Sequence, residues 1–215
     1  MTNDAFIEQM GDTERRIFEA ADSLFCRHGY DGVSIRDVAE TAGANKASVF
    51  YHFNSKEELF EQVLERYYVA HRQVLERALE GEGGLRDRLQ AAINAYFDFI
   101  VDNSRYPRLV QGLVTRGDSH ARFVERTLTP LFRWTVDALT EVAPEEGATG
   151  ARHFFLTFSG AVVNYFTYAP TLEKAWGDNP LADDQIEERR QHLLWLVDTC
   201  LDGLLRDVNR PKPDS

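Results

Sequence analysis

The sequence predicts an all-α fold, with an N-terminal three-helix helix-turn-helix domain (residues 1–56) and a C-terminal bundle of about six helices (residues 57–215). Apolar residues recur three and four positions apart along most of the chain, which is the period of an amphipathic helix. No segment alternates apolar and polar residues as a half-buried strand would. Capping residues, glycines and prolines divide the periodic stretches, so each helix has a recognisable start or stop.

The first helix is predicted from residue 13 to residue 28. Residues 1–12 lack the helical pattern and are expected to form a frayed arm. Gly29 ends the helix, because glycine adopts the left-handed conformation at a helix C-terminus at little cost. The helix should pack under the next two through one apolar stripe: Ile17, Ala20, Ala21, Leu24 and Phe25.

Residues 32–56 contain two short helices joined by a tight turn. Ser34 is the expected N-cap of the first helix, and Asp37 three residues later completes a capping-box-like pair. Gly43 is expected to end that helix. Its buried face repeats at helical spacing: Ile35, Val38, Ala39 and Ala42.

Asn45 can cap the second short helix, whose buried side is predicted to consist of Val49, Phe50 and Phe53. Small residues, hydrogen-bonding residues and one cation remain on the outside, and such side chains fit a DNA major groove. Two helices around a glycine turn favour a helix-turn-helix, although an ordinary helical hairpin shows the same pattern. The outward residues are Lys46, Ala47, Ser48, Tyr51 and His52.

Three segments within residues 13–64, IFEAADSLFCRHGY, SIRDVAETAGANKASVFYHF and NSKEEL, resemble the N-terminal domain of TetR/AcrR-type transcriptional regulators. The resemblance implies a dimeric repressor that binds double-stranded operator DNA and whose larger C-terminal domain binds a small molecule. One position departs from the family pattern. The family usually has a tyrosine at Phe50, whose hydroxyl commonly reaches a phosphate, so this contact is lost or passes to Tyr51.

The net charge of −11 does not by itself favour a nucleic-acid partner. Residues 32–56 are nevertheless locally cationic, so a few placed contacts could carry the affinity. We assign DNA contacts to the following residues: Ser34, Arg36, Asn45, Lys46, Ala47, Ser48, Tyr51, His52 and Lys56.

A long helix should run from Ser55, with Glu58 completing a second capping box, to about residue 80, where Gly81 to Gly84 end it. This helix is expected to be the main mechanical link between the two domains. Pro130 should kink or split the helix predicted over residues 119–142, or separate two successive helices. The remaining helices are predicted over residues 85–103, 107–117, 149–169 and 184–208, with a loop over 170–183.

The helix over residues 149–169 is apolar almost all the way round, so it should be buried on more than one side. A chain of 215 residues has few fully interior helices, which suggests that one side meets a second copy of the chain. A four-helix homodimer interface with the last helix is also what the resemblance implies. The candidate dimer residues are Phe158, Val162, Leu201 and Leu204.

Aromatic side chains are frequent in the C-terminal part, and each is either plain core or part of a ligand pocket. They suggest an apolar or aromatic effector, with polar residues orienting its polar end. The candidate ligand-binding residues are Tyr96, Phe97, Phe132, Phe155, Phe158, Arg116 and Asn164.

No spacing of histidine, cysteine or carboxylate residues fits a metal site, and no nucleotide-binding or nucleophile motif occurs. We therefore expect no enzymatic activity, no cofactor and no metal. The acidic N-terminus is not a signal peptide, and no apolar run approaches about 20 residues, so a cytoplasmic protein without a membrane partner is expected. Cys26 and Cys200 are expected to be buried free thiols.

Together with the resemblance, which implies a repressor that binds a small molecule, these features predict a ligand-responsive DNA-binding transcriptional regulator that its effector releases from the operator. The main alternative is a DNA-binding architectural or protein-partner protein without a small-molecule effector. A helical enzyme is a more distant alternative.

Overall fold

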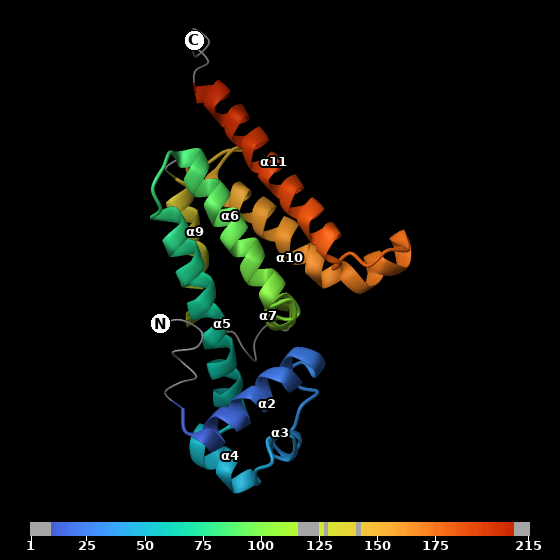
Figure 1. Ribbon diagram of the computed structural model, residues 1–215. Coiled ribbons are helices and arrows are strands. Elements are labelled where there is room, and N and C mark those ends of the chain that lie inside the picture. Colours follow the sequence, from blue (N-terminus) through green and yellow to red (C-terminus); the bar gives the residue numbers. More distant parts are fainter. Residues whose placement is uncertain (1–9, 116–124, 127–128, 141–142, 209–215) are drawn as a thin grey trace. The chain divides into compact units, whose positions relative to one another are not determined.

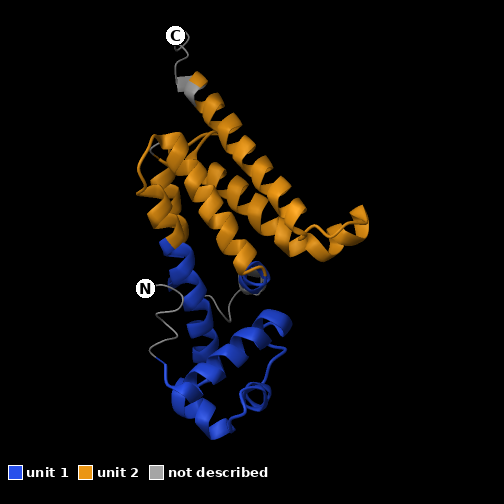
Figure 2. Ribbon diagram, viewed as in Figure 1, with its two compact units in different colours: residues 1–73, 105–130 blue, residues 74–104, 131–215 orange. Residues whose placement is uncertain are grey.

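The computed structural model describes residues 10–115, 125–126, 129–140 and 143–208, and the regular elements within these ranges are helices (Figure 1). The all-α prediction is therefore confirmed for the described part of the chain. The described residues form two compact units, one drawn from Met1–Gln73 and Arg105–Pro130 and the other from Val74–Ser104 and Leu131–Ser215 (Figure 2). We call them unit 1 and unit 2 and describe each by itself.

Unit 1 begins with three short helices and continues into a long one. The predicted boundaries of the first four of these helices are met within about one or two residues, the precision that capping signals allow. Its helices are α2 (Asp12–His28), α3 (Ile35–Thr41), α4 (Lys46–Phe53), most of α5 (Lys56–Leu79) and α7 (Tyr106–Thr115).

Large aromatic side chains fill the core of unit 1. Phe18, Phe25, Phe53 and Phe60 are each at most 1% exposed. The rings of Phe25 and Phe60 meet edge to face with centroids 4.9 Å apart, which joins α2 to α5. Full burial of one such side chain stabilises the fold by about 1.5–3 kcal/mol, so this cluster holds the short helices in place.

A buried polar network also ties α2 to α5. The Asp22 carboxylate accepts a hydrogen bond from Arg66 at 2.9 Å and another from the Tyr67 hydroxyl at 2.7 Å. Arg66 is only 9% exposed, so its charge depends on this partner. Cys26 lies in the same network, with its sulfur 3.6 Å from an Asp22 oxygen.

Helix α7 belongs to unit 1. Its residue Tyr106 is buried and stacks on Tyr67 of α5, with ring centroids 4.8 Å apart, and α7 also contacts α2. Burial lowers the pKa of the neighbouring His71 to about 3, so this imidazole is neutral at pH 7. Within unit 1, α7 thus packs on both α5 and α2, a contact that the sequence analysis did not predict.

Unit 2 is a bundle of longer helices. In Figure 1, α10 and α11 lie beside α6, and ion pairs between α6 and α11 include Arg190 with Asp98 at 2.6 Å and Arg86 with Asp198 at 2.6 Å. The helices are α6 (Leu85–Asp102), α9 (Thr129–Leu139, whose first two residues fall in unit 1), α10 (Ala151–Trp176) and α11 (Asp183–Val208).

Two predicted boundaries in the C-terminal part need comment. Helix α10 does not end at Ala169 but continues through Pro170 to Trp176 and stops at Gly177, which has φ 83°. Proline fits helical φ and removes one hydrogen bond, so the helix can continue past Pro170, although most residues from 171 to 176 are exposed. The helix predicted over residues 119–142 lies partly outside the described residues, and its described part, α9, starts next to Pro130.

The predicted domain boundary after Lys56 differs from the division into compact units. Unit 1 extends along α5 to Gln73 and also includes α7. A boundary of function between residues 1–56 and 57–215 stays a prediction.

Candidate nucleic-acid interface

The turn between α3 and α4 is built by three local signals. The Ser34 hydroxyl accepts a hydrogen bond from the Asp37 N–H at 3.2 Å, while the Asp37 carboxylate accepts one from the Ser34 N–H at 2.8 Å. Gly43 then reverses the chain with φ 61°. Asn45 caps α4 by accepting a hydrogen bond from the Ser48 N–H at 2.8 Å. Both predicted caps and the glycine stop are confirmed.

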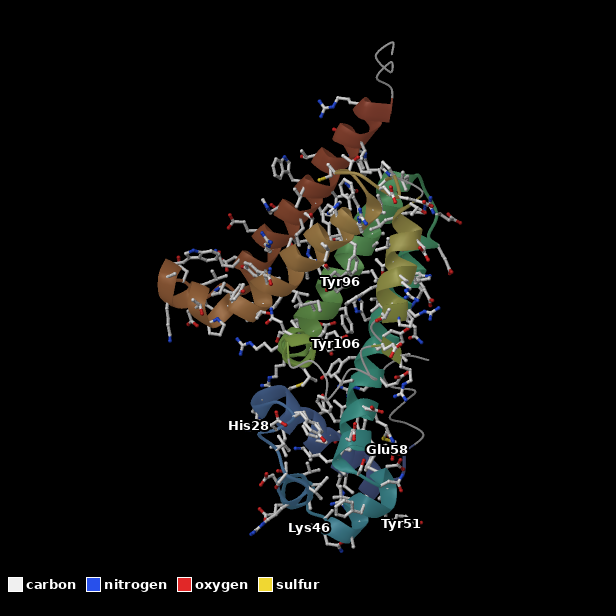
Figure 3. The ribbon with its side chains drawn as sticks, turned by 180° about the vertical axis from the view of Figure 1, so that it is seen from behind. His28, Lys46, Tyr51, Glu58, Tyr96 and Tyr106 are labelled. Carbon is white, nitrogen blue, oxygen red and sulfur yellow. The ribbon has the colours of Figure 1, made fainter. Side chains whose placement is uncertain are left out.

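The buried side of α4 anchors it to unit 1 and leaves the opposite side to solvent. Val49 and Phe53, four positions apart, are at most 1% exposed. Lys46, Ala47 and Tyr51 are exposed, and Tyr51 is 82% exposed. Figure 3 labels Lys46 and Tyr51 at the end of unit 1 where α3 and α4 lie.

The prediction for Phe50 was wrong. This side chain was placed on the buried side of α4, yet it is 48% exposed. In a helix each residue is rotated by about 100° from the previous one, so Val49 and Phe53 share a face that Phe50 leaves. Phe50 is therefore a surface residue of α4, which the direction of the core determines and the spacing alone does not reveal.

Two other candidate residues of α4 are partly engaged inside unit 1. His52 is half-buried, with its Nδ1 atom 3.9 Å from a Glu14 carboxylate oxygen and its ring 5.1 Å from that of Tyr51. Ser48 donates its hydroxyl to the Asn45 side chain at 3.1 Å. Part of the hydrogen-bonding capacity of these two side chains is already used within unit 1, so they have fewer free donors and acceptors for DNA than Lys46 has.

The remaining candidates surround α3 and the start of α5. Arg36 is exposed and pairs with Glu40 at 2.7 Å, which offsets its charge locally. The Lys56 ammonium lies 4.0 Å from the centre of the Tyr30 ring, and burial lowers the pKa of this lysine. Lys46, at the first position of α4, is thus the best-placed cation for a phosphate.

The candidate ligand-binding residues of unit 2 fall into separate groups. Tyr96 and Phe97 are buried on α6, and burial raises the pKa of Tyr96. Phe132 of α9, which is 38% exposed, lies 5.0 Å from the half-buried Phe155 of α10 between ring centroids. Phe158 of α10 is half-buried and stacks on the ring of Phe154.

Two of the predicted ligand-binding residues do not join these aromatic groups. Asn164 is exposed on α10, beside Gly160 and away from the buried Val162 and Phe166. Arg116 lies outside the described residues.

Three of the four candidate dimer residues are buried within one chain, and the dimer interface itself stays a prediction. Val162, Leu201 and Leu204 are each at most 7% exposed within one chain, and Leu204 packs with Ala143 and Ala151. Residues already covered by their own chain have no surface to offer a partner. The exposed large apolar side chains of the same two helices are instead Leu156, Tyr168, Trp176 and Trp195.

Within the ranges that the structure describes, no helix is long and apolar enough to cross a bilayer. Among the same residues, no three histidine, cysteine or carboxylate side chains gather as a metal site would require.

Residues 17–63 match the family model of bacterial regulatory proteins of the tetR family. The HTH-type transcriptional activator FasR of Mycolicibacterium smegmatis is 36% identical over 99 residues, 45% of either chain. The HTH-type transcriptional repressor NemR of Escherichia coli K12 is 35% identical over 81 residues, 37% of this chain and 41% of its own. The matched region thus spans less than half the length of these curated relatives, which are both transcriptional regulators.

Solved structures extend the similarity of fold to most of the chain. The ketosteroid regulator KstR2 of Mycobacterium tuberculosis has a TM-score of 0.66 at 19% identity, covering 91% of this chain and 96% of its own. AibR, crystallised with isovaleryl coenzyme A and operator DNA, has a TM-score of 0.67 at 15% identity, covering 86% and 97%. At these identities the comparison concerns the fold.

The capped helix pair, the exposed side of α4 and the family match identify the N-terminal part as a helix-turn-helix domain of the type found in bacterial regulatory proteins of the tetR family. The match of residues 17–63 to the tetR family model agrees with the resemblance noted in the sequence.

Replacing Lys46 with alanine should weaken DNA binding without unfolding the protein, because the side chain is exposed. If Lys46 contacts a phosphate, the slope of log affinity against log salt should become shallower by about one. The measurement is fluorescence anisotropy at several salt concentrations, with Lys174→Ala, an exposed lysine of α10, as the matched control. Equal slopes for Lys46→Ala and wild type would remove this residue from the phosphate contacts.

Proposed function

We propose that the protein is a ligand-responsive DNA-binding transcriptional regulator, and that it acts as a repressor which leaves its operator when a small apolar or aromatic effector binds. The observation that carries the proposal is the exposed face of α4, held rigidly by the buried Val49 and Phe53 and led by Lys46. Such a face suits a major groove, where phosphate contacts position the helix and base-edge contacts specify sequence.

The proposal includes a homodimer, because two recognition helices must enter successive major grooves about 34–36 Å apart. Helices α10 and α11 leave large apolar side chains uncovered in one chain. Leu156 is 63% exposed, Trp195 60% and Trp176 57%. Several large apolar side chains exposed on two helices favour a protein–protein contact, and a second copy of this chain is the proposed partner.

The proposed effector site lies among the aromatic residues of unit 2, around α6, α9 and α10. Phe132 and Phe155 retain exposure although their rings pack together, so an apolar ligand would bury further surface there. The structure of AibR with isovaleryl coenzyme A supports a ligand with an apolar acyl part in a protein of this fold. Asn164, on another face of α10, is the weakest member of the predicted set.

Activation is the one specific alternative to repression. FasR is an activator, whereas NemR is a repressor, and both match the same N-terminal region. Repression remains the proposal because it requires only that the dimer occupy its operator and leave on ligand binding. A transcription assay on a promoter that carries the operator, with and without protein, distinguishes the two.

The DNA-binding part is tested by selecting duplexes from a randomised pool with the purified protein. We expect enrichment of an inverted repeat whose half-sites lie about 10–10.5 base pairs apart, or a multiple of this spacing. Lys46→Ala should reduce recovery of the enriched duplexes. Failure to enrich any sequence over non-specific binding would overturn the proposal.

The effector part predicts reciprocal coupling. A ligand can shift the equilibrium between two arrangements only by its difference in affinity for them. Operator DNA should therefore weaken effector binding by the same factor by which effector weakens operator binding, roughly 5–150-fold. The measurement is calorimetric titration of isovaleryl coenzyme A and a panel of aromatic acids, with and without the selected duplex. Identical affinities for every ligand that binds would favour the alternative of an architectural DNA-binding protein without effector control.

A further inference from the structure

The outward ridge of α4 consists of Ala47, Phe50 and Tyr51, at positions i, i+3 and i+4 of one short helix. Residues with this spacing are neighbours on a helix surface. All three are exposed, Phe50 by 48% and Tyr51 by 82%. The only side-chain polar atom of the ridge is the Tyr51 hydroxyl, so most of its surface can neither donate nor accept a hydrogen bond.

Packing fixes the direction of this ridge. Val49 and Phe53 are at most 1% exposed and occupy the buried side of α4, and the Asn45 cap holds the first turn. Phe50 cannot turn inward without displacing one of them. Covering an exposed phenyl ring with an apolar group is favourable in water, so an apolar contact at Phe50 would stabilise DNA bound to the proposed recognition helix.

The major groove offers one such partner. Base edges there carry hydrogen-bond donors and acceptors, and the thymine C5-methyl is the apolar group that an alanine or phenylalanine side chain contacts. The resemblance to TetR-type regulators expects a tyrosine at this position with a hydroxyl on a phosphate. Phe50 has no hydroxyl, so its ring is left to apolar contact, whereas the phosphate contact is proposed for Lys46.

We infer that Phe50, with Ala47 beside it, determines operator specificity by contacting thymine methyl groups, so each half-site carries a thymine facing this ridge. The inference rests on the proposed DNA-binding function. In this inference Phe50 distinguishes thymine from uracil, which differ only in one methyl group. Tyr51 extends the same surface and keeps a hydroxyl for a polar contact.

The test replaces the thymines of the selected duplex by deoxyuridine, one at a time, which removes the methyl group and leaves base pairing intact. For wild-type protein, at least one substitution in each half-site should weaken binding roughly fourfold, the factor expected for burial of one methyl group. The Phe50→Ala variant should bind the thymine and deoxyuridine duplexes equally. Affinities are compared by fluorescence anisotropy at reduced salt, where phosphate contacts keep every variant measurable.

Two variants provide the controls. Leu181→Ala removes an exposed apolar side chain of unit 2 that lies outside the proposed dimer face and should leave the thymine preference unchanged. Phe50→Leu keeps apolar bulk and should retain part of the preference. Circular dichroism checks that all variants keep their helical content.

The outcomes separate the inference from the function on which it rests. Wild-type binding that is insensitive to every deoxyuridine substitution overturns the inference, as does a preference that persists in Phe50→Ala. In both cases the selected duplex is still bound, so the DNA-binding function stands. If no duplex is selected at all, the proposed function itself fails.

Discussion

Replacing Asp22 with alanine is expected to lower the free energy of unfolding by about 3 kcal/mol, because removing one partner of a buried pair strands the other charge. Asp22 accepts hydrogen bonds from Arg66 at 2.9 Å and from the Tyr67 hydroxyl at 2.7 Å. The side chain of Arg66 is 9% exposed and that of Asp22 20%, so solvent can replace the lost contacts only in part. The effect should therefore lie at the low end of the range for buried pairs.

The measurement is urea unfolding followed by circular dichroism, which reports the helices of both units. The matched control is Asp12→Ala on the same helix, where the Asp12 carboxylate pairs with Arg15 at 2.6 Å but is 82% exposed. That variant should lose about 1 kcal/mol or less. If both variants unfold at the urea concentration of wild type, the network does not hold α2 to α5.

Replacing Leu201 with glutamate should unfold unit 2 rather than merely separate two subunits. Leu201 is 5% exposed within one chain, so the variant loses an apolar contact and buries a carboxylate. Leucine-to-alanine changes alone cost about 2–5 kcal/mol in a core, and an unpaired buried charge adds to this. Tryptophan fluorescence is a suitable probe, because Trp134, Trp176 and Trp195 all lie in unit 2.

The paired variant is Trp195→Glu on the same helix. Trp195 is 60% exposed, so the free energy of unfolding of one chain should change by about 0.5 kcal/mol or less. If the proposed homodimer uses this face, sedimentation velocity should show a folded monomer. A Leu201→Glu protein that sediments as a folded dimer would contradict the burial of Leu201. A Trp195→Glu protein that remains dimeric would show that the dimer interface does not include Trp195.

Local signals in the sequence predicted the helix-turn-helix well. The Ser34 and Asn45 caps and the Gly43 stop act within three or four residues of the chain, so their effect can be read without knowing the rest of the fold. Capping also placed the start of α5, where the Ser55 hydroxyl accepts a hydrogen bond from the Glu58 N–H at 3.0 Å.

Properties that depend on tertiary packing were less predictable. Phe50 is as apolar as Phe53, and only the direction of the core decides which of them is buried. Val162 and Leu201 were assigned to the dimer interface for the same reason. The sequence of an apolar helix face does not show whether the same chain or a second copy covers it. Tyr106 of α7 is far from Tyr67 in sequence, so their stacking in unit 1 could not be anticipated.

The Asp22 network has a consequence for the chemistry of Cys26. Burial, with the neighbouring carboxylate, raises the pKa of this thiol to about 12. Only the thiolate attacks alkylating reagents, so Cys26 is nearly inert at neutral pH while α2 stays on α5. Its modification then requires an opening that exposes it and restores an ordinary pKa. The rate of Cys26 alkylation therefore serves as a clock for the local opening of the DNA-binding unit, independent of any transition that unfolds the whole chain.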